Sequence, residues 1–191
     1  MDKAALDELL RRARQRDPEA LAELVDAYSP RVFGLLFRLT GRRDVAEDLL
    51  QETCLRVVRV IEQYEHVGKF ESWLFRIAAN LARDRTRTRA RRGEMGSLEA
   101  TAGDARPLLS GAAEVGAADP ARRVVEQEAQ ERLAACLARL SDADREVILL
   151  RHYSELSFKE IAKLLGVPLG TALARAHRAL QRLRTELADE A

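Results

Sequence analysis

Residues 156–184 read LSFKEIAKLLGVPLGTALARAHRALQRLR and carry the clearest structural pattern in the chain. Ser157 and Glu160 form an S-x-x-E capping box, which predicts that a helix starts directly after the serine. Gly166 takes a left-handed C-cap without strain, so this helix is expected to end there. Pro168 fits the first turn of a second helix, where its missing N–H costs no hydrogen bond. Two helices joined by so short a turn make a helix-turn-helix.

The second helix of this motif is basic. No acidic residue lies between Gly170 and Arg184, and the helix also carries Arg175, Arg178 and Arg182. Such a helix suits the major groove of DNA, because guanidinium groups bind phosphates and donate to base edges. The alternative is an αα-hairpin whose arginines only face solvent. The run of unpaired positive charge favours DNA.

The composition is that of a helix-rich globular protein with segregated charge. The 191 residues are 47% hydrophobic and 33% charged, with a net charge of +1. Residues 44–52 hold four acids and no base, whereas residues 83–92 hold six arginines and one acid. This segregation predicts one surface for a protein partner and others for nucleic acid.

Residues with metal-binding or catalytic chemistry are few and scattered. Cys54 and Cys136 lie in apolar helical patterns without paired spacing, so both are expected to be buried thiols in a reducing cytoplasm. His66, His152 and His177 lack metal-ligand spacing. No apolar run approaches the ~18 residues that cross a bilayer. We therefore expect a cytoplasmic protein that is not an enzyme, with no catalytic residues, metal, cofactor or small-molecule substrate.

Helical periodicity continues through the first half of the chain. A polar helix is expected over residues 2–16, and Asp17 can cap the next one. Pro30 predicts a break in that next helix, and Gly41 predicts its end. Asp44 opens a long helix, DVAEDLLQETCLRVVRVIEQY, whose valine-rich part could pass for a strand but continues a helical stripe. Its acidic outer side is either an ordinary solvated face or a docking face for a basic partner.

Residues 62–69 are expected to form a loop, after which Phe70 starts the helix FESWLFRIAANLARDRTRTRARR. One side of this helix is apolar. Another side can stack on bases and donate to their edges, because it combines Trp73, Arg76, Asn80, Arg83, Asp84 and Arg87. The alternative is that the tryptophan belongs to the core, which is favoured for that residue alone, and that the arginines face solvent. The arginine density favours a phosphate backbone as the partner of the helix.

Composition changes between residues 93 and 120, which hold five of the ten glycines and no aromatic residue. This acidic segment is expected to be a flexible linker. It divides the chain into a first domain of residues 1–92 and a second domain of residues 121–191, which contains the helix-turn-helix. No convincing strand pair occurs, so we expect an all-α fold of two small helical domains.

Three motifs, in this order, resemble bacterial RNA polymerase sigma factors of the extracytoplasmic-function (ECF) group. They are DVAEDLLQETCLRV (44–57), FESWLFRIAANLARDRTR (70–87) and the helix-turn-helix (156–184), and the resemblance covers nearly the whole chain. It implies a sigma factor that binds core RNA polymerase and directs promoter recognition, DNA melting and transcription initiation. The first domain would bind polymerase and the −10 element, and the second the −35 element of promoter DNA. Family members are commonly held off by an anti-sigma factor, which is a further expected partner.

The resemblance also assigns residues to each surface. Core polymerase would contact Asp48, Leu49, Gln51, Glu52 and Arg56. The −10 element would contact Tyr64, Lys69, Phe70, Trp73, Arg76, Asn80, Arg83 and Arg87. The −35 element would contact Lys159, Thr171, Leu173, Ala174, Arg175, His177, Arg178 and Arg182. The loop that ends at the −10 helix would hold a flipped base, because a flipped base needs rings that replace its lost stacking.

One departure from the family concerns the −35 surface. After Gly-Thr the family usually has Val-Lys-Ser-Arg, whereas this chain has Leu173 and Ala174 at the two polar positions. Neither side chain donates to a phosphate or a base, although either can touch a thymine methyl. Val167 also replaces the expected polar N-cap, at a cost of about 1 kcal/mol. We therefore expect weak or unusual −35 recognition.

Two other functions explain part of the pattern. A free-standing helix-turn-helix regulator would bind DNA without polymerase, but it leaves the acidic helix around residues 44–52 unexplained. A sigma mimic would bind a sigma-sequestering partner and no DNA, but it has no use for the arginines of residues 83–92.

Overall fold

The computed structural model describes residues 2–65, 69–91, 128–129, 132–154 and 156–189. Within these ranges every regular element is a helix, which confirms the expected all-α fold. The helices are α1 (Lys3–Arg14), α2 (Pro18–Thr40), α3 (Arg43–Val60), the short 3-10 helix η1 (Ile61–Gln63), α4 (Phe70–Arg91), α6 (Asp142–Ser154), α7 (Phe158–Leu165) and α8 (Leu169–Asp189). Residues 132–138 are helical as well. The expected linker, residues 93–120, lies outside the described ranges.

Several helix ends follow from the signals in the sequence. The Asp17 carboxylate accepts from the backbone N–H groups of Glu19 and Ala20 at 3.0 and 3.3 Å, which caps α2 as expected. Gly41 closes α2 in the left-handed conformation, at φ 67°. The Ser141 hydroxyl accepts from the N–H of Asp144 at the start of α6.

The break expected at Pro30 is wrong, because α2 runs through it without interruption. Proline removes one helical hydrogen bond, which would join its nitrogen to the carbonyl of Asp26. Both residues are exposed, so water can satisfy that carbonyl. On the opposite side of α2, Leu24 and Leu36 are buried in the core. Burial of this continuous apolar stripe offsets the roughly 3 kcal/mol that an interior proline costs.

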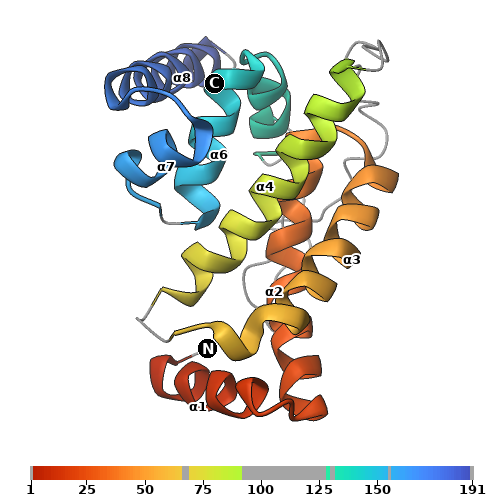
Figure 1. Cartoon of the computed structure of the whole chain (residues 1–191). Helices are drawn as coiled ribbons and strands as arrows, with labels where there is room; N and C mark the ends of the chain where they lie inside the picture. Colours follow the sequence, from red (N-terminus) through yellow and green to blue (C-terminus); the bar gives the residue numbers. More distant parts are fainter. Residues whose placement is uncertain (1, 66–68, 92–127, 130–131, 155, 190–191) are drawn as a thin grey trace.

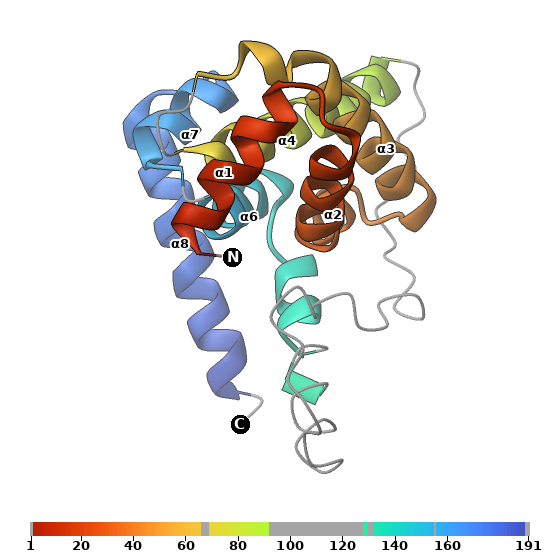
Figure 2. The same ribbon diagram turned by 90° about the horizontal axis from the view of Figure 1, so that it is seen from below.

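The long helix α4 lies in the middle of the molecule (Figure 1). It packs against α2 and α3 on one side and against α6 on the other. Helix α2 also contacts α6 directly, and α1 packs against α2. In the view from below, α8 and residues 132–138 both extend toward the bottom of the picture, α8 on the left and residues 132–138 on the right (Figure 2).

The two halves of the chain share one apolar core. The main cluster of buried residues joins Leu35 and Phe75 of the first half to Cys136, Leu149 and Leu183 of the second. A second cluster joins α6 to the helix-turn-helix and includes one residue from α4, Ala79. The second half of the chain therefore packs against α4 mainly through α6.

Candidate nucleic-acid interface

The helix-turn-helix forms by the local rules that its sequence predicts. The backbone N–H of Ser157 donates to the Glu160 carboxylate at 2.9 Å, and the Ser157 hydroxyl accepts from the Glu160 N–H at 3.3 Å. Gly166 ends α7 at φ 66°, in the left-handed region that a residue with a Cβ avoids. The next helix begins at Leu169, one residue after Pro168. The capping box and the glycine together fix the angle at which α8 leaves α7.

Helix α8 presents most of the predicted −35 residues to solvent. Its buried stripe consists of small and apolar residues: Ala172, Ala176, Ala179 and Leu183. Its outer side exposes Leu173, Ala174, His177, Arg178 and Arg182, while Thr171 and Arg175 are half-buried. Lys159 is exposed on α7. Leu173 keeps 45% of its surface, as does Leu169 one turn earlier, so the departure from the family pattern creates an apolar strip on this side.

The arginines of α8 are not all unpaired, contrary to the expectation from the local sequence. Arg178 donates to the Asp144 carboxylate on α6 at 2.9 Å, and Arg182 donates to Glu186 at 3.1 Å. The first acid comes from another helix, and the second follows Arg184, where the acid-free stretch of α8 ends. Exposed pairs of this kind are worth about 0–1 kcal/mol, so a DNA phosphate can replace the carboxylate.

Helix α4 exposes part of its predicted −10 surface. Arg76, Asn80 and Arg87 are exposed on the helix, and Lys69 is exposed just before it. Arg83 is half-buried, because its guanidinium group points toward the helix-turn-helix and donates to the carbonyl oxygens of residues 164 and 165. The predicted −10 surface is therefore only partly exposed, because the Arg83 guanidinium group is turned away from solvent.

The aromatic part of that surface lies in the core, contrary to the expected exposed aromatic loop. Phe70 and Tyr64 keep only 2% and 6% of their surface, and Trp73 is half-buried. The rings of Tyr64 and Trp73 lie 4.8 Å apart, and Tyr28 meets Phe70 edge-on at 5.3 Å. Residues 66–68 of the loop lie outside the described ranges. In this arrangement the rings pack against one another at edge-on and tilted angles, and a base contact by Tyr64 or Phe70 stays a prediction that requires the cluster to open.

The outer side of α3 is polar with one apolar residue in its middle. Asp48, Gln51, Glu52 and Arg56 are exposed, as predicted for a docking face. Leu49 is 3% exposed and belongs to the core, so the expectation of a polymerase contact at this position does not fit its burial. Sequence reasoning missed Leu55, which is 57% exposed among these polar side chains.

Glu146 of α6 is a carboxylate on which basic residues from two helices, α4 and α8, converge. Its Oε1 lies 3.4 Å from Nε of Arg83. Burial raises the pKa of Glu146, and the positive charges of Arg83, Arg175 and Arg87 oppose that rise, whereas Asp142 adds to it. This residue thus joins the predicted −10 helix to the predicted −35 helix. Sequence reasoning missed Glu146, although an acid directly before the apolar residues 147–150 indicates a partly buried carboxylate that needs a basic partner.

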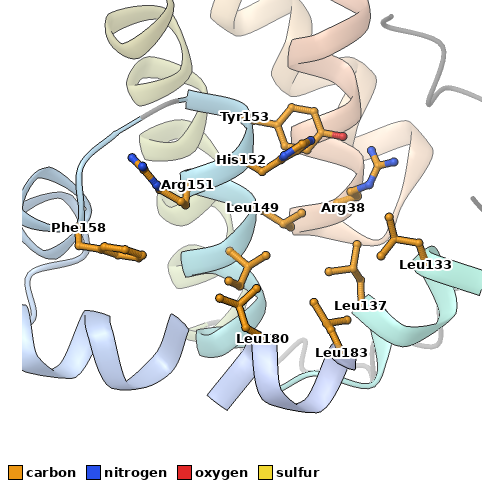
Figure 3. Close-up of a pocket in the computed structure, with 11 residues that line it drawn as sticks. Arg38, Leu133, Leu137, Leu149, Arg151, His152, Tyr153, Phe158, Leu180 and Leu183 are labelled. Carbon is orange, nitrogen blue, oxygen red and sulfur yellow. The ribbon is translucent and has the colours of Figure 1, made fainter. Parts of the chain in front are cut away.

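An apolar groove of about 780 Å³ opens between α6, α8 and residues 132–138 (Figure 3). Its floor and walls are mainly aliphatic: Leu133, Leu137, Ile148, Leu149, Leu180 and Leu183. Leu180 is 57% exposed. Arg38, Arg151 and His152 add basic groups to the lining. An amphipathic helix with acids beside its apolar side would complement such a groove.

Neither thiol forms a disulfide in the described part of the chain. Cys136 is buried as expected, whereas Cys54 is only half-buried, and burial raises the pKa of the Cys54 thiol. Among the described residues no group of His, Cys, Asp and Glu side chains could hold a metal ion. No described helix combines the length and the apolar character needed to cross a membrane.

Comparison with known proteins shows the family to which the chain belongs. The family model "Sigma-70 region 2" matches residues 24–92, and "Sigma-70, region 4" matches residues 130–183. The ECF RNA polymerase sigma factor SigW of Bacillus subtilis is 32% identical to this chain, over 94% of the chain and 95% of SigW. The chain belongs to the ECF sigma factor family. Its function is therefore to direct promoter-specific transcription, and neither rival function accounts for both matched regions.

Other relatives agree with this assignment of the sigma factor. SigE of Mycolicibacterium smegmatis is 39% identical over 87% of the chain and 61% of SigE. The sigma factor RpoE of Bartonella quintana, solved in complex with the anti-sigma factor NepR, is 25% identical with a TM-score of 0.59, and the match covers 91% of this chain and 98% of RpoE. CnrH, solved with the cytosolic domain of CnrY, has the same TM-score at 21% identity and 96% and 97% coverage, and it supports the fold alone.

Proposed function

We propose that three helices of this ECF sigma factor bind core RNA polymerase and the two promoter elements. The outer side of α3 binds core RNA polymerase, the basic side of α4 binds the −10 element, and the outer side of α8 binds the −35 element. The protein acts in the cytoplasm, through binding energy and without bond chemistry of its own. The observation that carries this proposal is the separation of exposed charge, with four exposed acids in the first three turns of α3 and exposed arginines on α4 and α8.

The polymerase-binding side of α3 has the composition of a protein interface. Leu55 supplies exposed apolar area, and Gln51, Glu52 and Arg56 surround it with polar groups. Interfaces commonly place an apolar contact inside a polar rim, which excludes water from the centre. We propose Leu55 as a polymerase contact in place of the buried Leu49.

The −10 side of α4 supplies donors for a DNA strand. The guanidinium groups of Arg76 and Arg87 can bind phosphates, and the Asn80 amide can donate to and accept from a base edge. The rings of Tyr64 and Trp73 would stack on bases only after the aromatic cluster opens, and that step fits the melting of the duplex.

The −35 side of α8 combines apolar and basic contacts. Leu173 and Leu169 are half exposed and lie on the side that also carries Arg178. Methyl groups of leucine pack well on the C5-methyl of thymine, whereas they form no hydrogen bond with the edge of a guanine or cytosine. We therefore propose that this sigma factor favours thymine where relatives with Lys and Ser make polar contacts.

The apolar groove supports a further partner. Its aliphatic lining and its basic residues complement a helix that has an apolar side and acidic neighbours. RpoE of Bartonella quintana was solved with an anti-sigma factor. We infer that an anti-sigma factor binds this chain through such a helix.

Binding to core RNA polymerase tests the proposed role of α3. The Glu52→Lys variant reverses one exposed charge on α3, and Glu23→Lys reverses one exposed charge on α2 as a matched control. We expect Glu52→Lys and Leu55→Ala to weaken binding at least about tenfold, since interface anchors contribute about 2 kcal/mol or more. Equal binding by wild type and all three variants would remove α3 from the interface.

A further inference from the structure

The exposed leucines of α8 lie in one row along the helix. Leu169, Leu173, Leu180 and Leu187 keep between 40% and 57% of their surface. They follow one another at intervals of four, seven and seven residues, which places them on one side of an α-helix. Leu180 lines the apolar groove, whereas Leu169 and Leu173 lie in the first two turns. In a recognition helix these turns contact base edges, so the first two leucines belong to the DNA-binding end of the row.

This end of α8 exposes only apolar side chains. None of the exposed residues between positions 168 and 174 carries a side-chain hydrogen-bond donor or acceptor: they are Pro168, Leu169, Gly170, Leu173 and Ala174. The nearest polar side chains, those of Thr171 and Arg175, are half-buried. A Cβ atom added at Gly170 would meet no atom within 4 Å outside the adjacent part of the helix, so the surface between the two leucines is open. The exposed side chains here can recognise a base only by apolar contact.

Positive charge surrounds the apolar end of α8. The chain has no acidic residue between Glu160 and Glu186. Lys159 on α7 and Arg178 on α8 are both exposed. DNA matches both features, because its phosphates attract basic side chains and its major groove contains an apolar group. The occupant of this surface is therefore a DNA duplex.

The apolar group in the major groove is the C5-methyl of thymine. 5-Methylcytosine carries the same methyl group at the same ring position, and uracil pairs like thymine but lacks it. Thymine and 5-methylcytosine differ at C4, where thymine has an acceptor oxygen and cytosine a donor amino group. A polar side chain distinguishes these two groups by hydrogen bonding, whereas a leucine side chain forms no hydrogen bond with either.

We propose that Leu169 and Leu173 recognise the C5-methyl group itself, so that 5-methylcytosine in the −35 element is bound more tightly than cytosine. This inference rests on the proposed role of α8 and adds a form of regulation to it. Enzymatic methylation of a cytosine at the contacted position strengthens promoter recognition although the base sequence is unchanged. The expected gain is about fourfold, the effect of burying one methyl group.

A promoter library with a randomised −35 half first locates the contacted base. Wild type and Leu173→Lys, each bound to bacterial core RNA polymerase, select fragments from this library, and the bound fragments are sequenced. We expect one position at which wild type enriches thymine and Leu173→Lys does not. The fragment that wild type selects is then synthesised with thymine, uracil, cytosine or 5-methylcytosine at this position, each opposite its own partner base.

Two matched pairs of duplexes then isolate the methyl group, because the opposite base is the same within each pair. For wild type, uracil should bind about fourfold more weakly than thymine, and 5-methylcytosine about fourfold more tightly than cytosine. Leu173→Lys should lose both differences. Leu187→Lys makes the same charge change in the last turn of α8, where the leucine is 40% exposed, and should keep both.

The outcomes separate methyl recognition from the proposed role of α8. If a −35 element is selected but wild type binds the two members of each pair equally, methyl recognition is overturned and the role of α8 stands. The same holds if both proteins enrich thymine at the same positions. If no −35 element is selected at all, the proposed role of α8 is contradicted, and methyl recognition with it.

Discussion

Helices α4 and α8 are both rich in arginine, yet they expose their predicted DNA-binding residues to different extents. Helix α8 buries a stripe of alanines and leaves Leu173 and Arg178 on its outer side. Helix α4 directs Phe70 into the core and Arg83 into the contact with α7. The same sequence pattern thus leaves the predicted −35 residues of α8 mostly exposed, whereas the predicted −10 residues of α4 are exposed only at Arg76, Asn80 and Arg87. Four substitution experiments test this contrast.

The largest expected effect concerns the first turn of α4. Phe70→Ala should lower the free energy of unfolding by about 3–5 kcal/mol, because it leaves a cavity among Tyr28, Tyr64 and Trp73. Leu173→Ala, on the exposed side of α8, should change it by no more than about 0.5 kcal/mol. Urea unfolding of both variants measures the difference. A small loss for Phe70→Ala would mean that this ring is not in the core.

The next effect concerns DNA binding by α8. Arg175→Ala should weaken binding to a −35 element by about 1–3 kcal/mol, as the loss of a guanidinium contact does. Leu173→Lys should strengthen binding and raise the slope of log affinity against log salt by about one unit, since it adds one phosphate contact. Binding isotherms at several salt concentrations check both. If neither substitution has an effect, α8 does not bind the −35 element.

A pair of glycines tests how α8 is positioned. Gly166→Ala should destabilise the protein by about 1–2 kcal/mol, because φ at this position is +66° although no atom crowds the added methyl. Gly170→Ala lies inside α8 with open space around it and should stabilise the protein by about 0.4–1 kcal/mol. Thermal unfolding distinguishes the two signs. Equal effects would show that the turn does not depend on the left-handed cap.

The smallest effect is a pH dependence of protein stability that arises at Glu146, which lies between α4 and α8. Its pKa is raised in the folded protein, mainly by burial, despite Arg83, Arg175 and Arg87. The folded state therefore binds a proton more tightly than the unfolded state. Relative to Glu146→Gln, wild type should gain stability as pH falls through the raised pKa, and the gain should level off below the ordinary pKa of about 4.3.

Urea unfolding of both proteins between pH 7 and pH 4 gives this difference directly. A wild type that loses stability relative to Glu146→Gln as the pH falls would show that its arginine partners dominate over burial.

Local signals in the sequence predicted the local structure well. The caps at Asp17, Gly41 and Ser157 follow from hydrogen bonds between residues at most four positions apart, so a short window contains all the information. The break at Pro30 failed, because packing of the whole stripe on α2 outweighs one missing hydrogen bond.

Contacts between distant residues were not predictable from these patterns. The exposure of Arg83 depends on carbonyl groups at the end of α7, which no local pattern indicates. The burial of Tyr64 depends on two rings of α4, those of Phe70 and Trp73. Residues on α8 were placed more accurately, because its buried stripe repeats with helical spacing and leaves its outer side defined.

Transcription with purified components tests the function of the whole chain most directly. The protein is mixed with bacterial core RNA polymerase and a library of promoter fragments, and the transcripts are sequenced. We expect transcripts that start at a fixed distance downstream of a shared two-part element, whose −35 half contains thymine opposite Leu173. A folded protein that forms no complex with core polymerase and yields no such transcripts would contradict its role as a sigma factor.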